Sequence, residues 1–564
     1  MTFTRILFLF LTLFFTSHSL SAQILNSKSY QNGLVVSADK YASEIGRDIL
    51  KQGGNAVDAA VAVQFALAVT LPRAGNIGGG GFMVIHLANG ETNTLDFREK
   101  APARAARDMY IKNGELDSDL SWEGILSVGV PGTVDGMIKA LERYGRLPLD
   151  AVIEPAIKLA AEGYELSYSQ AKDLNNHKET LEKYPASKKY FTTGDTTFFK
   201  EGDLFVQSDL AETLRRISYF GREGFYLGPV ADAIVNQMKK TGGLIEYRDL
   251  RNYESKWRKP ITTDFMGYTL HMMPPPSSGS VAITQILEMI EDYNLKSMGH
   301  NSADYVHVVA EAMRRAFADR AYFLGDPDFV NIPLNELLSE SYNAERMQSF
   351  SMDDATSSQS LSHGEILSIS ESSETTHFSV IDADGNAVAV TTTLNGSFGS
   401  HVAVDGAGFL LNNEMDDFSA QPGKPNKYGL IGGVANAIEP GKRMLSSMTP
   451  TIVTKGGKVN MILGSAGGPR IITATLQSFL NRAVFDMRPQ QATAVPRFHH
   501  QWLPDVLLFD DFGLSPDTQA LLEEKGHRLF PYPAIGRFHN IFVEHDGTYI
   551  GGVDPRGDGF ASGY

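Results

Sequence analysis

The chain of 564 residues is long enough for one large domain or several ordinary ones, and 42% of its residues are hydrophobic while 21% are charged. This mixture is typical of a globular protein with a sizeable core and excludes a disordered or fibrous chain. The formal net charge of -16 argues against nucleic acid or an anionic membrane surface as the main partner, because both are bound through Lys and Arg. The chain has no Cys, which excludes disulfides, thiolate metal sites and thiolate nucleophiles.

The N-terminus has the layout of a secretory signal peptide. Arg5 precedes an apolar run over 6–15, and small residues follow as far as Ala22. The run is too short to span a bilayer, and no later segment reaches the length of a membrane helix. We therefore expect residues 1–22 to be removed and the protein to be periplasmic or secreted, with no integral membrane segment after removal of the signal.

Helices and a glycine turn are predicted in the first two thirds of the chain. The small residues of "GGNAVDAAVAVQFALAV" (53–69) predict a helix packed on several sides, and a glycine turn at 78–81 then leads into a strand. No Lys and Ser or Thr follow these glycines, as a phosphate loop requires, so we interpret them as a turn that allows close packing. Apolar residues at helical spacing predict an amphipathic helix over 303–323. "PPPSSGS" (274–280) is predicted to be a loop, since its serines lack the nucleophile-elbow pattern.

The segment 351–374 differs in character from the residues after it. It holds nine serines and few large apolar residues, so we expect an exposed and flexible connection. The sequence "TTHFSVIDADGNAVAVTTTLN" (375–395) then predicts a β-hairpin. With a three-residue turn at 384–386, Thr375 lies opposite Asn395.

This register separates the two faces of the hairpin. One face is apolar and consists of Phe378, Val380, Val388, Val390 and Leu394. The other is mostly small or polar and consists of Thr375, His377, Ser379, Thr391, Thr393 and Asn395. A hydroxyl-rich patch is therefore predicted around Thr375, at the end of the hairpin farthest from the turn.

A threonine hydroxyl is a poor nucleophile unless a base lies beside it. Cleavage between Glu374 and Thr375 would supply that base, because Thr375 would then carry a free α-amine with a pKa of roughly 7.7 to 8. The serine-rich segment would become the end of a separate subunit. The alternative is that threonines simply favour strands and that the linker is only a linker.

Four motifs in order resemble the small subunit of bacterial gamma-glutamyltransferases, also called glutathione hydrolases. They are the hairpin sequence itself, "LLNNEMDDFSAQPG", "LSSMTPTIV" and "GSAGGPRIITATLQ". The first half resembles the large subunit in "GGNAVDAAVAVQFALAV", "GNIGGGGFM", "LDFREKAP" and "VGVPGTVDG". The resemblance extends to the final "DPRGDGFASGY". It implies a mixed α/β fold, the four-layer αββα sandwich of N-terminal nucleophile hydrolases, assembled from a large subunit 23–374 and a small catalytic subunit 375–564 cut from one precursor.

The resemblance also implies roles for individual residues. It makes Thr375 the nucleophile for both self-cleavage and acyl transfer, and places Thr393 within hydrogen-bond reach of it. Arg98 of "DFRE" is implied to bind the substrate α-carboxylate, which suits a planar bidentate donor. Taken alone, Arg98 could equally form an ordinary surface or interface ion pair.

The remaining substrate contacts implied by the resemblance form a clamp for a zwitterion. Asn395, Glu414 and Asp417 correspond to residues that hold the α-amino group, and Ser446 and Ser447 to residues that bind the α-carboxylate. Some relatives carry Gln where this chain has Glu414. Tyr428 lies in "QPGKPNKYGLIGG", which resembles the loop that covers the glutamyl pocket. Without the resemblance, "NNEMDD" would be interpreted as a polar turn and "LSSM" as a strand end.

A pair of glycines is assigned to the oxyanion, and a pair of histidines is assigned no catalytic role. Gly467 and Gly468 fall between a predicted strand and a helix, where backbone N–H groups are suited to stabilise an oxyanion; alone they would indicate only a tight turn. His499 and His500 lack further ligands at recognisable spacing and are predicted to be structural. We expect no metal and no organic cofactor.

Together these features predict an exported, self-processing γ-glutamyl hydrolase or transferase. Its expected substrates are glutathione and related γ-glutamyl compounds, its acceptors are water, amino acids or dipeptides, and its partner is the other half of its own chain in a heterodimer, with no nucleic acid. Two alternatives remain open. One is a cephalosporin (glutaryl) acylase of the same fold, and the other is a non-catalytic exported binding protein that kept the pocket.

Overall fold

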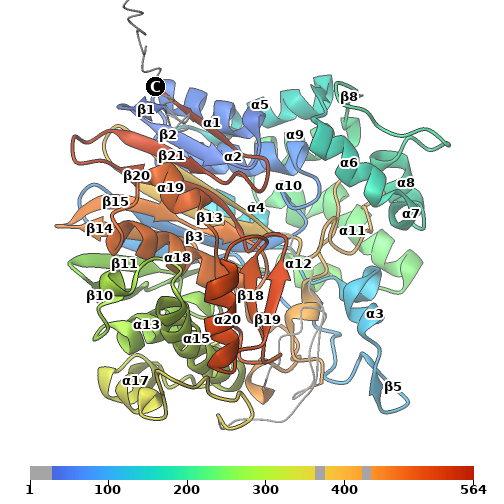
Figure 1. Cartoon of the computed structure of the whole chain (residues 1–564). Coiled ribbons are helices and arrows are strands. Elements are labelled where there is room, and N and C mark those ends of the chain that lie inside the picture. Colours follow the sequence, from blue (N-terminus) through green and yellow to red (C-terminus); the bar gives the residue numbers. More distant parts are fainter. Residues whose placement is uncertain (1–27, 362–374, 422–432) are drawn as a thin grey trace, which may run out of the picture.

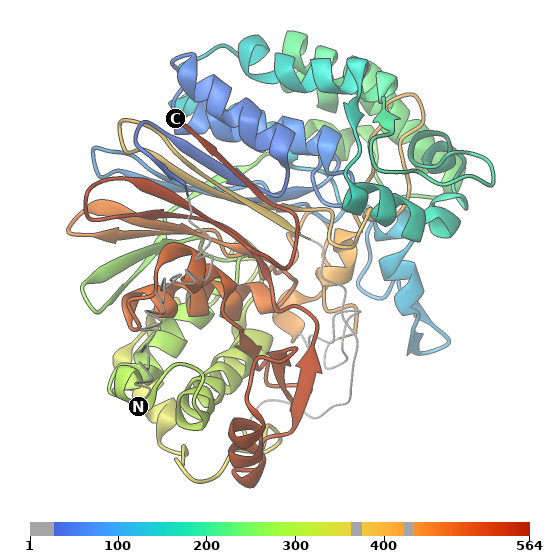
Figure 2. The same cartoon turned by 45° about the horizontal axis from the view of Figure 1, so that its top comes forward.

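The computed structural model describes residues 28–361, 375–421 and 433–564. The expected signal segment, Glu374 and Tyr428 lie outside the described residues. Two large sheets stack at the centre, and helices cover the outer face of each sheet (Figures 1 and 2). This confirms the predicted mixed α/β sandwich with four layers.

The first sheet contains the predicted hairpin, and all its neighbouring strands are antiparallel. Its order is β22 (Phe560–Gly563), β2 (Leu34–Ser37), β12 (Thr376–Ile381), β13 (Ala387–Thr393), β3 (Gly80–His86), β4 (Thr92–Asp96) and β9 (Lys256–Arg258). The second sheet has the order β1 (Ser29–Tyr30), β21 (Tyr549–Val553), β20 (Arg537–Val543), β15 (Lys458–Leu463), β14 (Thr451–Lys455), β11 (Tyr268–Met272) and β10 (Ile261–Phe265), with β16 (Ser465–Ala466) also paired to β20.

Helices from both ends of the chain form the outer layers. The first sheet is covered by α1 (Lys40–Lys51), α2 (Ala56–Thr70), α4 (Thr133–Tyr144), α5 (Leu149–Glu162) and α9 (Ser208–Phe220). The second sheet is covered by α13 (Gly279–Ile290), α15 (Ala303–Phe323), α18 (Arg470–Ala483) and α19 (Pro489–Ala494), with α17 (Glu340–Met347) and α20 (Pro516–Glu524) further out.

Three apolar cores correspond to the three boundaries between the four layers. In β3, Met83 and Ile85 pack into the core beneath the first helical layer, whereas Phe82 and Val84 pack between the two sheets. The alternation follows from the period of two residues in a strand. A strand that is buried on both faces therefore contributes alternate side chains to two cores, one under the helices and one between the sheets.

The helix predicted over 53–69 is α2, and all fifteen of its residues are buried. Asn55 and Asp58 form a capping box at its start. The following glycines pack closely, as predicted: a Cβ on Gly79 would lie 2.1 Å from the carbonyl oxygen of Thr393, and one on Gly81 would lie 2.3 Å from that of Thr391. A side chain at either position would push β3 away from the hairpin strand.

The helix predicted over 303–323 has the predicted bounds, but the prediction of an exposed polar face is wrong. All but three of the 21 residues of α15 are buried. Its charged residues pair inside the protein instead of facing water, as Glu311 does with Arg314 at 3.1 Å and with Arg315 at 2.6 Å. In the part of the chain that the structure describes, no helix combines the length and apolar character needed to cross a membrane.

Residues 351–361, the described part of the serine-rich segment, pack against the body of the protein. Ser358 is fully buried, donates its backbone N–H to Asp505 at 2.8 Å and accepts the indole N–H of Trp502 at 2.9 Å. Ser358 and Leu361 are buried, whereas five residues of 351–361 are exposed, so this part is anchored at two points and the expectation of a flexible connection stays a prediction. Residues 362–374 lie outside the described residues.

The predicted hairpin forms, but its predicted register is wrong by two residues. Thr376 pairs with Thr392 and Ile381 with Ala387, so Thr375 comes opposite Thr393 rather than Asn395. Asp382 determines the turn, because its Oδ1 accepts the backbone N–H groups of Asp384 at 3.0 Å and Asn386 at 2.9 Å. A shift of two residues keeps every side chain on its face, so the separation of the two faces is retained.

We predict that acid destabilises the protein through its buried histidines. Burial lowers the pKa of His271, His401 and His500 to about 4 and that of His499 and His527 to about 3. Histidine in an unfolded chain titrates near 6.5, so below that pH the unfolded state binds more protons than the folded state. The free energy of unfolding should therefore fall as the pH is lowered from about 7 towards 4, measured by urea unfolding with tryptophan fluorescence.

A pair of substitutions tests the cause. His401 has a φ of +62°, which Asn tolerates, so His401→Asn should reduce the dependence of stability on pH. The matched control is His545→Asn, because His545 is exposed. Unfolding midpoints that stay constant between pH 7 and 4 would contradict the prediction.

Candidate active site

One polar pocket collects nine of the residues singled out in the sequence. Its lining includes Arg98, Thr375, Thr393, Asn395, Glu414, Asp417, Ser446, Ser447 and Gly468. Gly467 is the chain neighbour of Gly468 and does not itself line the pocket. Since these residues come from segments more than 300 positions apart, only the folded sandwich brings them together.

Thr375 lies at the pocket end of the hairpin, immediately before β12, and is half-buried. The strand pairing places Thr393 across from it. The Thr393 hydroxyl is almost fully buried and accepts the backbone N–H of Asn395 at 2.7 Å. Because that oxygen acts as an acceptor, the hydroxyl keeps one proton to donate to a neighbouring group.

Asn395 turns the chain out of β13 in a left-handed conformation with a φ of +75°. Asn adopts this conformation more readily than most residues. Its side-chain amide donates to the carbonyl of Asn413 at 3.0 Å, and Asn413 in turn accepts the N–H of Gly396 at 2.8 Å. These bonds fix the end of the hairpin against the turn that carries Glu414.

Arg98 is completely buried and is surrounded by carboxylates. Its guanidinium contacts Glu414 at 2.5 Å and Glu99 at 3.4 Å, and also pairs with Asp417. The backbone carbonyls of Met444 and Leu445 each accept a further N–H at 3.3 Å. The guanidinium of Arg98 thus donates hydrogen bonds to Glu99, Asp417 and two backbone carbonyls and forms an ion pair with Glu414.

Burial and crowding of charge shift the pKa values of this cluster. Burial raises the pKa of Glu99 to about 8 and that of Glu414 well above its usual range, and it also raises that of Asp417, although Arg98 acts in the opposite direction on all three. Burial alone would lower the pKa of Arg98, but its carboxylate neighbours raise it. Burial therefore favours the protonated form of these carboxylates, and the charge of Arg98 opposes it.

Ser446 and Ser447 lie in a loop that the "PPPSSGS" segment supports. The backbone N–H of Ser278 donates to the carbonyl of Ser446 at 2.7 Å, and the N–H of Ser446 donates to the carbonyl of Pro276 at 2.8 Å. The structure thus gives 274–280 a role that the sequence did not indicate: it holds the serine loop at the pocket.

Gly467 and Gly468 connect β16 to α18, as predicted. Their φ values are +134° and +58°, in the region where side chains are strained. A Cβ on Gly467 would also lie 3.2 Å from Gly536. Glycine at these positions brings bare backbone to the edge of the pocket beside Thr375.

Arg320 is a charged pocket residue that the sequence analysis missed. It lies near the end of α15, 4% exposed, and its guanidinium reaches Ser278 and Ser447. The sequence predicted only the helix in which Arg320 lies, and no role was assigned to Arg320. Asn436 was missed too, although it donates to the carbonyl of Asp417 at 2.7 Å and accepts the N–H of Leu445 at 2.9 Å.

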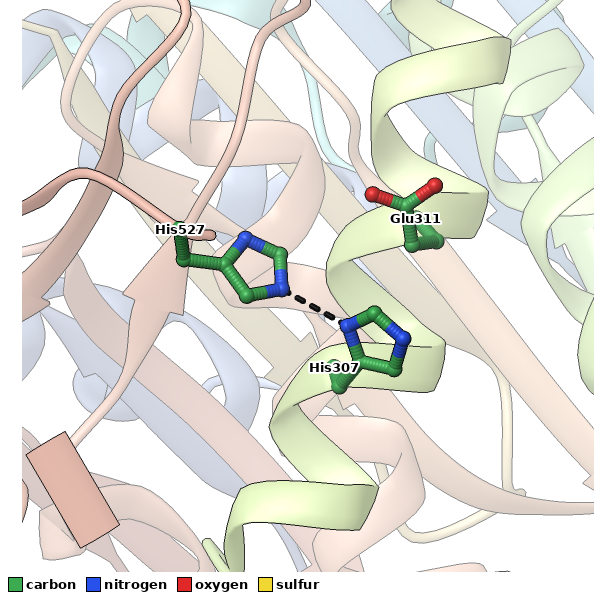
Figure 3. A group of neighbouring side chains, drawn as sticks. All are labelled: His307, Glu311 and His527. Carbon is green, nitrogen blue, oxygen red and sulfur yellow. Dashed lines mark hydrogen bonds between the residues drawn. The ribbon is translucent and has the colours of Figure 1, made fainter. Parts of the chain in front are cut away.

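One group of described residues has the composition of a metal site (Figure 3). His307 Nδ1 lies 2.7 Å from His527 Nε2, and Glu311 is one helical turn beyond His307. That separation is a hydrogen bond between two rings, and both carboxylate oxygens of Glu311 already accept N–H groups, from Arg314 and Arg315. A divalent ion would have to displace these bonds beside two buried arginines, so the donor set does not fit a metal.

His499 and His500 each have a hydrogen-bond partner in the interior. The ring of His499 lies 2.8 Å from the hydroxyl of Thr473 and 2.9 Å from the side-chain oxygen of Gln501. His500 Nε2 lies 3.2 Å from Asp505. Both therefore act as packing and hydrogen-bonding residues in the core, as predicted.

An αββα sandwich with a threonine at the head of a central strand and a polar pocket around it defines the class of N-terminal nucleophile hydrolases. Comparison with known proteins identifies the family within this class. The family model described as gamma-glutamyltranspeptidase matches residues 42–564. The chain belongs to the gamma-glutamyltranspeptidase family.

Individual members of the family are similar in sequence to nearly the whole chain. The glutathione hydrolase proenzyme of Escherichia coli (strain K12) is 47% identical over 551 residues, which cover 97% of this chain and 94% of that protein. That of Pseudomonas sp. (strain A14) is 49% identical over 506 residues, covering 89% and 88%. The crystal structure of cephalosporin acylase from Bacillus halodurans has a TM-score of 0.85 at 28% identity, covering 96% of this chain and 97% of that one.

We predict that Glu414 tolerates an amide but not truncation. Burial raises the pKa of Glu414 and so favours its neutral form, which resembles an amide in shape and in its ability to donate. Glu414→Gln should therefore change the free energy of unfolding by less than about 1 kcal/mol. Glu414→Ala should cost about 2 kcal/mol or more, because it leaves a cavity and removes a partner from buried Arg98. Urea unfolding of both variants measures the difference, and a Gln variant as unstable as the Ala variant would contradict it.

Proposed function

We propose that this protein hydrolyses the γ-glutamyl amide of glutathione and related compounds and transfers the glutamyl group to water, amino acids or dipeptides. The proposal rests on one observation: Thr375 and Thr393 line the same pocket as a set of carboxylates and a pair of serine hydroxyls. Two relatives 47% and 49% identical are named glutathione hydrolase proenzymes, which supports the same activity here.

The proposed reaction begins with cleavage of the precursor between Glu374 and Thr375. Thr375 then carries both the nucleophilic hydroxyl and the amine that accepts its proton. The Thr375 oxygen attacks the γ-carbonyl, its proton passes through the α-amine to the leaving nitrogen, and the C–N bond breaks to leave an ester on Thr375. Water or an acceptor amine then attacks the ester and releases the glutamyl group while the Thr375 hydroxyl regains its proton. Backbone N–H groups at Gly467 and Gly468 are the proposed stabilisers of the oxyanion.

The glutamyl group is proposed to bind through both of its charges. Asn395, Glu414 and Asp417 are assigned to the α-ammonium, whose positive charge suits a cluster rich in carboxylates. Ser446, Ser447 and Arg98 are assigned to the α-carboxylate. Since three carboxylates and two backbone carbonyls already surround the Arg98 guanidinium, a direct contact with the substrate carboxylate is proposed to replace one of these partners.

Three further assignments belong to this proposal. Residues 1–22 act as a signal peptide for export to the periplasm or beyond. The chain segments 23–374 and 375–564 form a heterodimer after cleavage. Tyr428 belongs to a loop that covers the glutamyl pocket.

Glutaryl acylase activity is the second candidate. It is favoured by the similarity in fold to a cephalosporin acylase. A glutaryl group has no α-amine, however, so it would make no use of the ammonium contacts assigned to Asn395, Glu414 and Asp417. A non-catalytic binding role leaves the paired threonines and the bare glycine turn without a purpose.

We predict that Thr375→Ala leaves the precursor uncut and inactive. Denaturing electrophoresis should resolve the wild type into two chains, the smaller with an N-terminal sequence beginning at Thr375, and the variant as one chain. The substitution removes the only oxygen nucleophile on that side chain, so both self-cleavage and acyl transfer should stop.

Thr376→Val is the matched control, because it removes the neighbouring hydroxyl while keeping the shape of the side chain. It should still be cut and remain active. Cleavage of Thr375→Ala at the same bond would show that Thr375 is not the internal nucleophile.

We predict that Asp417→Ala weakens γ-glutamyl substrates selectively. Loss of this carboxylate removes a partner of the α-ammonium in a partly dry pocket. The transition state for a γ-glutamyl anilide, as measured by kcat/KM, should therefore be destabilised by about 2 kcal/mol. The matched glutaryl anilide lacks the amine and should lose much less. Both compounds are measured on wild type and variant, and a wild-type preference for the glutaryl compound would favour the acylase.

A further inference from the structure

Arg320 connects α15 to the serine loop of the pocket. Its side chain is almost fully buried, and it lines the same pocket as Thr375. Its Nε donates to Ser278 Oγ at 2.9 Å, and its Nη2 donates to Ser447 Oγ at 3.1 Å. One planar guanidinium thus holds two hydroxyl groups in a fixed relative position.

This contact determines what the Ser447 hydroxyl can offer to a ligand. A serine oxygen carries a single proton, and an arginine N–H can only donate. Because Ser447 Oγ accepts from Arg320, the Ser447 proton is left for another acceptor. The hydroxyl of Ser446 is arranged likewise, since its Oγ accepts the backbone N–H of Met448 at 3.1 Å.

The second hydroxyl held by Arg320 stabilises the same loop. Ser278 Oγ accepts from Arg320 and donates to the carbonyl of Ser446 at 2.7 Å. The backbone N–H of Ser278 donates to the same carbonyl, also at 2.7 Å. Arg320 therefore orients Ser447 directly and restrains Ser446 through Ser278.

Two hydroxyl donors in the lining of one pocket match a carboxylate, which accepts hydrogen bonds and cannot donate them. We propose that Arg320 is a positioning residue that fixes Ser447 as a hydrogen-bond donor to the α-carboxylate of the bound glutamyl group. This inference rests on the proposed function and adds a residue to its carboxylate site.

The test compares two competitive inhibitors of a γ-glutamyl anilide reaction. L-Glutamate has the α-carboxylate, whereas 4-aminobutyrate is the same molecule without it. Arg320→Gln should raise the KM of the anilide and the inhibition constant of L-glutamate by about tenfold, and should change that of 4-aminobutyrate by less than about twofold. The effect on kcat should be smaller than that on KM, because the bond is made in the ground state as well.

Two more variants test whether Arg320 acts through Ser447. In a Ser447→Ala background, Arg320→Gln should add a smaller change than it causes in the wild type, because the bond to Ser447 is already lost and only the restraint of Ser446 through Ser278 remains. Arg320→Lys keeps the charge but not the fork, so its inhibition constant for L-glutamate should lie between those of wild type and Arg320→Gln. Independent, multiplicative effects of the two substitutions would overturn the proposal.

Arg315→Gln is the matched control for loss of a buried arginine on the same helix. Arg315 is fully buried and pairs with Glu311, and it does not line the pocket. Its replacement should lower stability without changing the ratio of the two inhibition constants. If Arg320→Gln does not fold, Ser278→Ala replaces it, since removing the acceptor of Nε should weaken L-glutamate alone.

The results separate this inference from the proposed function. If the wild type neither cleaves the γ-glutamyl anilide nor binds L-glutamate, the proposed function fails. If it does both and Arg320→Gln weakens the two inhibitors equally or leaves both unchanged, only the role of Arg320 is refuted.

Discussion

The pocket depends on the burial of Arg98. A guanidinium removed from water costs several kcal/mol unless it is paired, and here three carboxylates and two backbone carbonyls pair it. The partners come from its own segment, from 414–417 and from 444–445. None of these segments can be buried without the others, because an unpaired charge would then be removed from water. The completed cluster therefore requires the whole sandwich to be folded first.

The folded sandwich also fixes the position of the candidate nucleophile, Thr375. Thr375 is at the end of a hairpin in the middle of the first sheet, with β2 on one side and β3 on the other. The close approach of Gly79 to the Thr393 carbonyl and the bonds from Asn395 to the turn at 413 fix that end. A reactive group gains precision when it is carried by packed strands rather than by a free loop.

Local features were predictable from the sequence, and distant pairings were not. The small residues of α2 and the alternation in the hairpin predicted the right helix and the right faces, because both depend on the period of one element. The register failed because the side chain of Asp382, not the turn length, determines the pairing. The exposure of α15 failed because the partners of Glu311 and Arg320 include groups brought close only by folding. Arg320 and Asn436 lie outside the motifs, whereas the nine predicted pocket residues were found because their motifs resemble a known family.

The arrangement of the strands bears on how a cut chain would stay together. In the first sheet β22, β12 and β13, all after residue 374, alternate with β2 and β3 from the first part of the chain. In the second sheet β11 pairs with β14, and β1 with β21, across the same division. Cleavage at Thr375 would therefore sever one peptide bond while every one of these ladders and all three cores stayed intact. The contact between Arg320 and Ser447 crosses the same division, so the serine loop of the pocket would still be supported by the other chain. The pocket is thus a property of the two segments together, and neither half of the chain contains it alone.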